Sequence, residues 1–119
     1  MRAVPMAVVE TPFFLRKASA LLSEKERSEL IVFLGTNPEA GVVVPETGGV
    51  RKVRWAVQGK GKLGGVRVVT ISSETFPLFP FDLTVYAKNQ KANLTKAERQ
   101  EFRKLVPLLV STYAKGGQL

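Results

Sequence analysis

The residues best suited to chemistry gather in one basic stretch, from Gly48 to Arg67. Val53 and Trp55 alternate there with cationic residues, which is typical of a strand with one apolar and one basic face. Glycines then allow a turn, and a second strand is predicted over Val66–Ser72. Such a hairpin gathers positive charge on one sheet face, which suits a polyanion. The stretch holds no acidic residue and six cations: Arg51, Lys52, Arg54, Lys60, Lys62 and Arg67.

A second interpretation of this hairpin is structural. Half-exposed strands also carry Lys and Arg for solubility and to discourage edge pairing. Three features favour binding instead: the cations lack compensating acids, they surround a single hairpin, and Trp55 fixes the inner face. Because Trp55 is in register with Val53, we interpret it as a core residue rather than a base-stacking platform.

The chain contains neither histidine nor cysteine, which narrows the possible chemistry. Nucleophile schemes built on Ser/His/Asp or Cys/His are excluded, as are thiolate metal sites. The acids are Asp82 and scattered glutamates, so a metal-dependent nuclease is not predicted. A cationic scheme remains, in which Lys and Arg stabilise a phosphorane and a lysine acts as base. RNA suits this scheme because its 2′-hydroxyl supplies the nucleophile, with no cofactor or metal.

The segment from Gly59 to Gly64 matches the dinucleotide fingerprint G-x-G-x-x-G. That fingerprint must run from a strand into a helix, whereas this segment lies between two predicted strands. We therefore interpret its glycines as turn residues that let Lys60 and Lys62 approach phosphates closely.

Composition sets the broad class of protein. A chain of 119 residues with 45% hydrophobic content suits one folded domain, expected over residues 1–119. Its net charge of +8 favours a nucleic acid, an anionic membrane surface or an acidic protein as partner. With no signal-peptide pattern and no apolar run of membrane-spanning length, we expect a cytoplasmic protein that does not enter a membrane.

The remaining elements predict an α+β domain that positions the basic hairpin. Pro107 is expected to kink or interrupt the last helix. The aromatic run Phe76–Phe81 contains two prolines, so it is either a connection that covers the core or an exposed apolar patch. Ala40–Pro45 is expected to be a loop with at most a short extended piece. The other predicted elements are a strand over Val4–Glu10, a helix from Thr11-Pro12, a helix from Ser23 that ends at Gly35, a strand over Leu83–Ala87 and a helix from Thr95.

Several blocks of residues together resemble a known family. Each block alone is weak, but they occur in order over about residues 8 to 106. The chain is similar to the HigB branch of the RelE/ParE toxin superfamily, whose members are toxins of type II toxin–antitoxin systems. The blocks are Asn37–Gly41, Pro45–Gly49, Arg51–Trp55, Gly59–Lys62, Gly64–Val68 and Tyr86–Asn89.

The resemblance implies a RelE-like fold, with two N-terminal helices on a small curved antiparallel sheet and a C-terminal helix. It implies a ribosome-dependent endoribonuclease that cuts mRNA through attack of a 2′-hydroxyl on the adjacent phosphate. The partners it implies are mRNA, the ribosome and a cognate HigA-like helix-turn-helix antitoxin, in a toxin–antitoxin hetero-oligomer. ParE members share the fold yet poison gyrase, so a non-catalytic gyrase binder or a plain RNA- or DNA-binding module stays open as the alternative.

The resemblance also implies roles for single residues. Lys52 is the candidate base, because an arginine such as Arg54 stays protonated, and Arg67 is the candidate transition-state stabiliser. The family's basic position after the last strand falls on Lys88 or Lys91. RelE's base-stacking tyrosine has no clear match, and Tyr86 and Tyr113 are poor candidates. The predicted catalytic set is Lys52, Arg54, Arg67 and Lys88, and the predicted RNA-binding set is Arg51, Lys60, Lys62 and Lys91.

Overall fold

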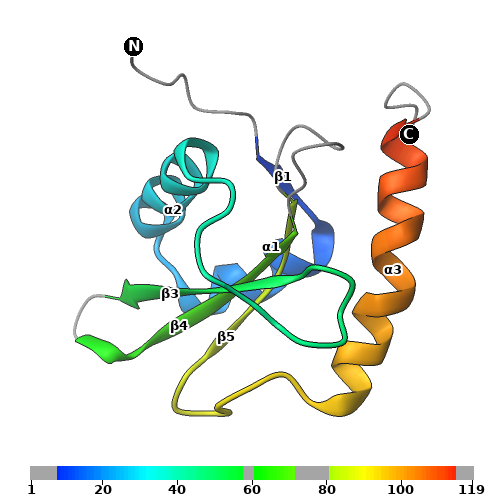
Figure 1. Ribbon diagram of the computed structural model, residues 1–119. Helices are drawn as coiled ribbons and strands as arrows, with labels where there is room; N and C mark the ends of the chain where they lie inside the picture. The colour runs from blue at the N-terminus through cyan, green and yellow to red at the C-terminus, as the bar shows by residue number, and fades with distance from the viewer. Residues whose placement is uncertain (1–7, 58–60, 72–80, 115–119) are drawn as a thin grey trace.

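The computed structural model describes residues 8–57, 61–71 and 81–114. These residues form three helices and a five-stranded sheet with the strand order β1-β5-β4-β3-β2 (Figure 1). The α+β class is therefore confirmed. In chain order the elements are β1 (Val9–Glu10), α1 (Pro12–Leu21), α2 (Glu24–Thr36), β2 (Val42–Val43), β3 (Arg51–Val57), β4 (Gly61–Ile71), β5 (Phe81–Ala87) and α3 (Lys96–Ala114).

The sheet is mixed, which corrects the expectation of an antiparallel one. Strands β2 to β5 pair antiparallel, but β1 pairs parallel with β5, with Val9 opposite Phe81 and Glu10 opposite Asp82. Parallel neighbours need a long connection, and here two helices and three strands separate β1 from β5. The alternation of side chains predicted β3, β5 and the part of β4 from Val66, but β4 already begins at Gly61, inside the segment expected to be a turn. Alternation gives no information on the direction of so short a strand as β1.

The predicted helix starts are confirmed, because short side chains cap them. The Thr11 hydroxyl accepts a hydrogen bond from the Phe14 backbone N–H at 3.1 Å and donates to the Asp82 carbonyl at 2.9 Å, which ties α1 to β5. Ser23 and Glu26 form a capping box at α2. Thr95 and Glu98 exchange the corresponding bonds at α3, at 2.8 and 3.1 Å.

Two helices continue past the residues that were expected to end, kink or interrupt them. Helix α2 continues through Gly35 to Thr36 and is capped by Asn37. Helix α3 does not stop at Pro107 but continues to Ala114. A proline removes one backbone hydrogen bond, here to the carbonyl of Arg103. Both residues are exposed, so water can bond that carbonyl and the helix continues.

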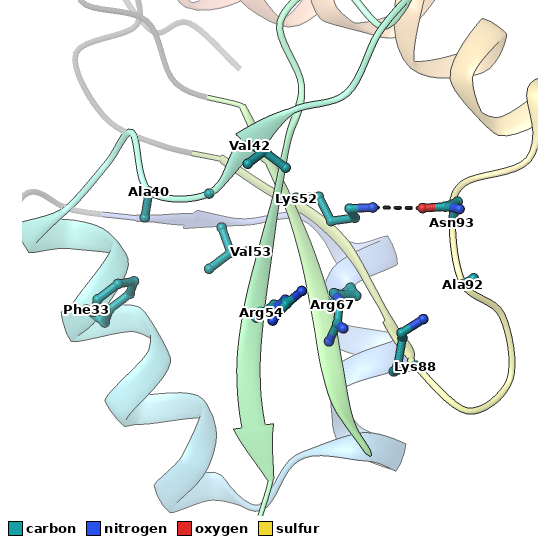
Figure 2. A pocket seen from close by; sticks show the side chains of 11 residues that line it. Phe33, Ala40, Val42, Lys52, Val53, Arg54, Arg67, Lys88, Ala92 and Asn93 are labelled. Atoms are coloured by element: carbon teal, nitrogen blue, oxygen red, sulfur yellow. Dashed lines mark hydrogen bonds between the residues drawn. The ribbon is translucent and has the colours of Figure 1, made fainter. Parts of the chain in front are cut away.

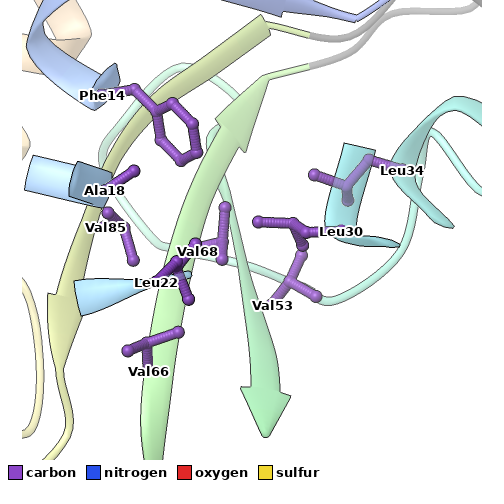
Figure 3. Packing of buried hydrophobic residues seen from close by; sticks show 9 residues of the cluster. All are labelled: Phe14, Ala18, Leu22, Leu30, Leu34, Val53, Val66, Val68 and Val85. Atoms are coloured by element: carbon purple, nitrogen blue, oxygen red, sulfur yellow. The ribbon is translucent and has the colours of Figure 1, made fainter. Parts of the chain in front are cut away.

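Two apolar clusters cover the two faces of the sheet. Helices α1 and α2 cover one face, where Phe14, Ala18, Leu22, Leu30 and Leu34 pack on Val53, Val66, Val68 and Val85 (Figure 3). The first half of α3 covers part of the other face. That second cluster comprises Val50, Val69, Ile71, Phe81, Leu83, Tyr86, Leu94, Phe102 and Val106. Because α3 covers only part of its face, the neighbouring part of β3 and β4 is free to hold a site.

Some expectations fall outside the described residues, namely most of the predicted first strand and the aromatic run up to Pro80. Phe81, the last residue of that run, begins β5 and is buried. Within the described ranges, no helix has the length and apolarity needed to cross a membrane.

A buried carboxyl group lies where β1 meets β5. Asp82 is fully buried, and its carboxyl oxygens have no hydrogen-bond partner in the described part of the chain. Burial, and then the negative charge of Glu10, raise the pKa of Asp82 from 3.8 to about 8. Glu10 itself lies 3.4 Å from the Arg27 guanidinium. At neutral pH the folded protein therefore keeps a proton on Asp82 that the unfolded chain has released.

Asp82→Asn is expected to flatten the pH dependence of stability. Unfolding releases the Asp82 proton between about pH 4 and 8, so the free energy of unfolding falls as the pH rises through that window. The slope due to this group is at most about 1.4 kcal/mol per pH unit. Urea denaturation at several pH values measures it. Glu101→Gln, which removes an exposed carboxylate, is the control, and equal slopes in wild type and Asp82→Asn would contradict the assignment.

Candidate functional site

The basic residues of the hairpin meet on one face of the sheet. Arg54 on β3 lies opposite Arg67 on β4, and Arg67 lies opposite Tyr86 on β5. Trp55 points to the helical face, where its ring lies 5.3 Å from that of Phe33, so its prediction as a packing residue is confirmed. The period-two alternation thus places the cations on the face that α1 and α2 leave uncovered.

Arg54 and Arg67 form an unfavourable pair. Like charges directly opposite each other on neighbouring strands destabilise a sheet. Arg54 is exposed, whereas Arg67 is only 4% exposed, and its guanidinium donates to the Val66 carbonyl at 3.3 Å. Neither arginine forms an ion pair with a carboxylate of the described residues. An anion bound between the two guanidinium groups would relieve this repulsion.

Lys52 lies on the same face, two residues before Arg54. Its Nζ donates a hydrogen bond of 2.8 Å to the Oδ1 of Asn93, in the segment between β5 and α3. This contact spans 41 positions of the chain and holds the ammonium group at a defined point beside the arginines. Asn93 was not singled out by sequence reasoning, because a polar residue in a loop shows its partner only once the chain has folded.

A cavity of about 670 Å³ joins these groups. Lys52, Arg54, Arg67 and Lys88 all line it, and no carboxylate of the described residues does. Figure 2 shows the four side chains next to one another along β3, β4 and the end of β5. The four residues of the predicted catalytic set therefore share one cavity, although they come from three parts of the sequence. Among the described residues, no group of three acidic side chains is placed to hold a metal ion.

At one wall of this cavity the backbone of Gly41 lies very close to the backbone of Lys52. Gly41 has φ +90°, and a Cβ built there would lie within van der Waals overlap of the Lys52 carbonyl oxygen. Arg51 supports the same wall, because its guanidinium donates to the Gly41 carbonyl at 3.3 Å. Arg51 thus has a partner in the protein and is not among the residues that line the cavity.

Of the other predicted RNA-binding residues, the structure describes the side chain of Lys91, which does not line the cavity. Lys60 lies outside the described residues, and Lys62 belongs to β4 without a described side chain. Lys91 pairs with Glu98 at 2.5 Å and lies 4.9 Å from the centre of the Tyr86 ring. Burial acts to raise the pKa of Glu98, but hydrogen bonds from Lys91 and Thr95 outweigh it and lower that pKa. Of the two alternatives after the last strand, Lys88 lies at the cavity and Lys91 does not.

Tyr86 lies opposite Arg67 on the neighbouring strand, and its side chain is only 7% exposed. Its hydroxyl has no hydrogen-bond partner in the described ranges. Burial raises the pKa of Tyr86, and the positive charge of Arg67 opposes that shift. Its ring packs in the second apolar cluster with Phe102 and Leu94, so Tyr86 helps to anchor β5 beneath α3.

Comparison with known families agrees with this arrangement. Residues 39–116, more than half of the chain, match the family described as the RelE toxin of the RelE/RelB toxin–antitoxin system. The chain belongs to the RelE toxin family. Membership implies an antitoxin partner, and the matched region contains β2 to β5 and α3. It therefore includes Lys52, Arg54, Arg67 and Lys88.

Arg54→Gln is expected to stabilise the protein. The substitution removes the repulsion between Arg54 and Arg67 and should raise the free energy of unfolding by a few tenths, at most about 1 kcal/mol, at low salt. The gain should shrink at about 1 M salt, where the screening length is roughly 3 Å. Urea denaturation at both salt concentrations measures the difference. Arg103→Gln, on the exposed side of α3, is the matched control. If the two variants changed the free energy of unfolding equally, repulsion between Arg54 and Arg67 would be refuted.

Proposed function

We propose that this RelE-family protein is a ribosome-dependent mRNA endoribonuclease of the HigB branch, which inhibits translation. The observation that carries the proposal is the cavity lined by Lys52, Arg54, Arg67 and Lys88, to which the described part of the chain contributes no carboxylate. Four cations facing one space are matched to the charge of a phosphodiester strand. The dianionic transition state of phosphodiester cleavage has more negative charge than the substrate, so fixed cations bind it more tightly.

The proposed reaction uses the nucleophile of the substrate. Lys52 takes the proton of a 2′-hydroxyl, and the 2′-oxygen forms a bond to the adjacent phosphorus. The bond from phosphorus to the 5′-oxygen then breaks, and the 5′-oxygen takes up a proton. Lys52 is the candidate base because the arginines of the cavity stay protonated, and its bond to Asn93 fixes the position of its nitrogen.

Arg67 is the candidate transition-state stabiliser. It is buried in the central strand β4, between Arg54 and Tyr86 on its neighbours. A guanidinium held by the sheet does not have to reorganise when charge develops on the phosphate oxygens. Arg54 and Lys88 flank it in the cavity and are assigned to the phosphate and its neighbours.

The proposal includes a cellular context. Antitoxins inhibit such a site when they cover or distort it, and we assign this role to a HigA-like helix-turn-helix protein in a hetero-oligomer. The mRNA and the ribosome are the other proposed partners, in the cytoplasm. The net charge of +8 supports an RNA-rich partner.

Lys52→Ala and Arg67→Ala are each expected to abolish growth inhibition on induction. In a reaction with purified ribosomes and mRNA, each should lower the cleavage rate by at least about 100-fold, as for loss of a general base or of a charge-stabilising donor. Arg103→Ala should leave the rate unchanged. Thermal melting separates lost chemistry from lost folding, because Arg67 is buried. If both variants stayed fully toxic at equal expression, the site would be wrongly assigned.

Mapping of cellular mRNA after induction tests the activity itself. Primer extension should reveal cuts in phase with codons, which disappear when the adjacent antitoxin is co-expressed. Intact mRNA together with stalled replication would instead favour a gyrase poison of the ParE kind.

A further inference from the structure

A second cavity of about 310 Å³ adjoins the first. Lys52, Asn93 and Val42 line both cavities. The hydrogen bond between Lys52 and Asn93 therefore lies at the boundary between them, with the larger cavity on one side and the smaller on the other. Arg99, on the first turn of α3, lines only the smaller one. Sequence reasoning did not assign Arg99 to any site.

The electrostatics of the second cavity match those of the first. Among residues 8–57, 61–71 and 81–114, it is lined by two cations, Lys52 and Arg99, and by no carboxylate. The Nε of Arg99 is buried and has no hydrogen-bond partner in the part of the chain that the structure describes. A buried donor without an acceptor destabilises the protein, because it has lost its hydrogen bonds to water. A phosphate oxygen would supply the missing acceptor through a charge-assisted bond.

Another part of the lining of this cavity is apolar and exposed to solvent. Val42 and Val43 form the edge strand β2 and are 63% and 52% exposed. The cavity volume lies near the lower end of the range of about 300–1,000 Å³ for small-ligand sites. An apolar lining in the same cavity as two cations suits a nucleotide, because its base and sugar present apolar surface and its phosphate presents charge. A free inorganic anion would leave that lining without a contact.

We propose that the second cavity binds a nucleotide that neighbours the scissile phosphate in the RNA strand. Arg99 binds the phosphodiester of this nucleotide, and Val42 and Val43 contact its nucleoside. The strand passes over the pair of Lys52 and Asn93 from one cavity to the next. This inference rests on the proposed function and extends the RNA path beyond the four cations of the cleavage site.

Binding of short RNA strands of increasing length tests this path. The probes are fluorescent, 2′-O-methylated oligouridylates, which cannot be cleaved by 2′-hydroxyl attack, measured by anisotropy between about 50 and 200 mM salt. For the longest strand, Arg99→Gln should weaken binding by roughly three- to tenfold. It should also reduce the slope of log affinity against log salt by about 0.7, the value for one phosphate contact of a single strand. The shortest strand contacts only the four cations of the first cavity. Arg99→Gln should therefore bind this strand as tightly as the wild type does.

Three variants make the result decisive. Arg103→Gln makes the same change one turn further along α3, away from both cavities, and should have no effect. Arg99→Lys keeps the charge and should retain the salt slope, so a loss as large as in Arg99→Gln would indicate helix packing and overturn the proposal. Arg54→Gln should weaken strands of every length. If only Arg54→Gln weakened binding, the second cavity would be wrong and the first would stand; if neither variant did, both assignments would fall.

Discussion

The fold has to keep side chains of like charge next to one another on two central strands, β3 and β4. Arg54 and Arg67 are in register, and Lys52 and Lys88 share their cavity. The opposing force comes from the other face of β3 and β4. Burial of a valine side chain contributes about 1.5–3 kcal/mol, whereas a pair of charges directly opposite each other on neighbouring strands is worth at most about 1 kcal/mol. Val53, Val66 and Val68 therefore outweigh the repulsion.

A second set of contacts fixes the segment that follows β5. Lys91 pairs with Glu98, and Glu98 in turn caps α3 through Thr95. This small network sets where the chain leaves the sheet and where α3 begins. Lys88 and Asn93 lie on either side of Lys91 and both reach the cavity. In the structure Lys91 thus has a positioning role, and Lys88 is the cation of this segment that faces the site.

Sequence reasoning reached as far as local periodicity allows. Alternation in Arg51–Trp55 and around Arg67 placed Lys52, Arg54 and Arg67 on one face, because side chains on a strand alternate with a period of two. Capping boxes predicted the starts of α2 and α3, because both residues of a capping box lie within one helical turn. The path of the segment between β5 and α3 shows that Lys88, and not Lys91, lines the cavity. The same path brings Asn93 and Arg99 close to Lys52. That path is set by contacts between residues far apart in the chain, which no local pattern encodes. The parallel pairing of β1 escaped prediction for the same reason.

The hydrogen-bond partner of Lys52 bears on its proposed role as a base. Its Nζ donates to an amide oxygen rather than to a carboxylate. A carboxylate at that position would stabilise the ammonium form by its charge, whereas a neutral amide does so far less. A neutral amine still has N–H groups to donate, so the bond to Asn93 can persist before and after proton transfer. The contact therefore holds the nitrogen of Lys52 in place, beside the guanidinium groups that line the same cavity.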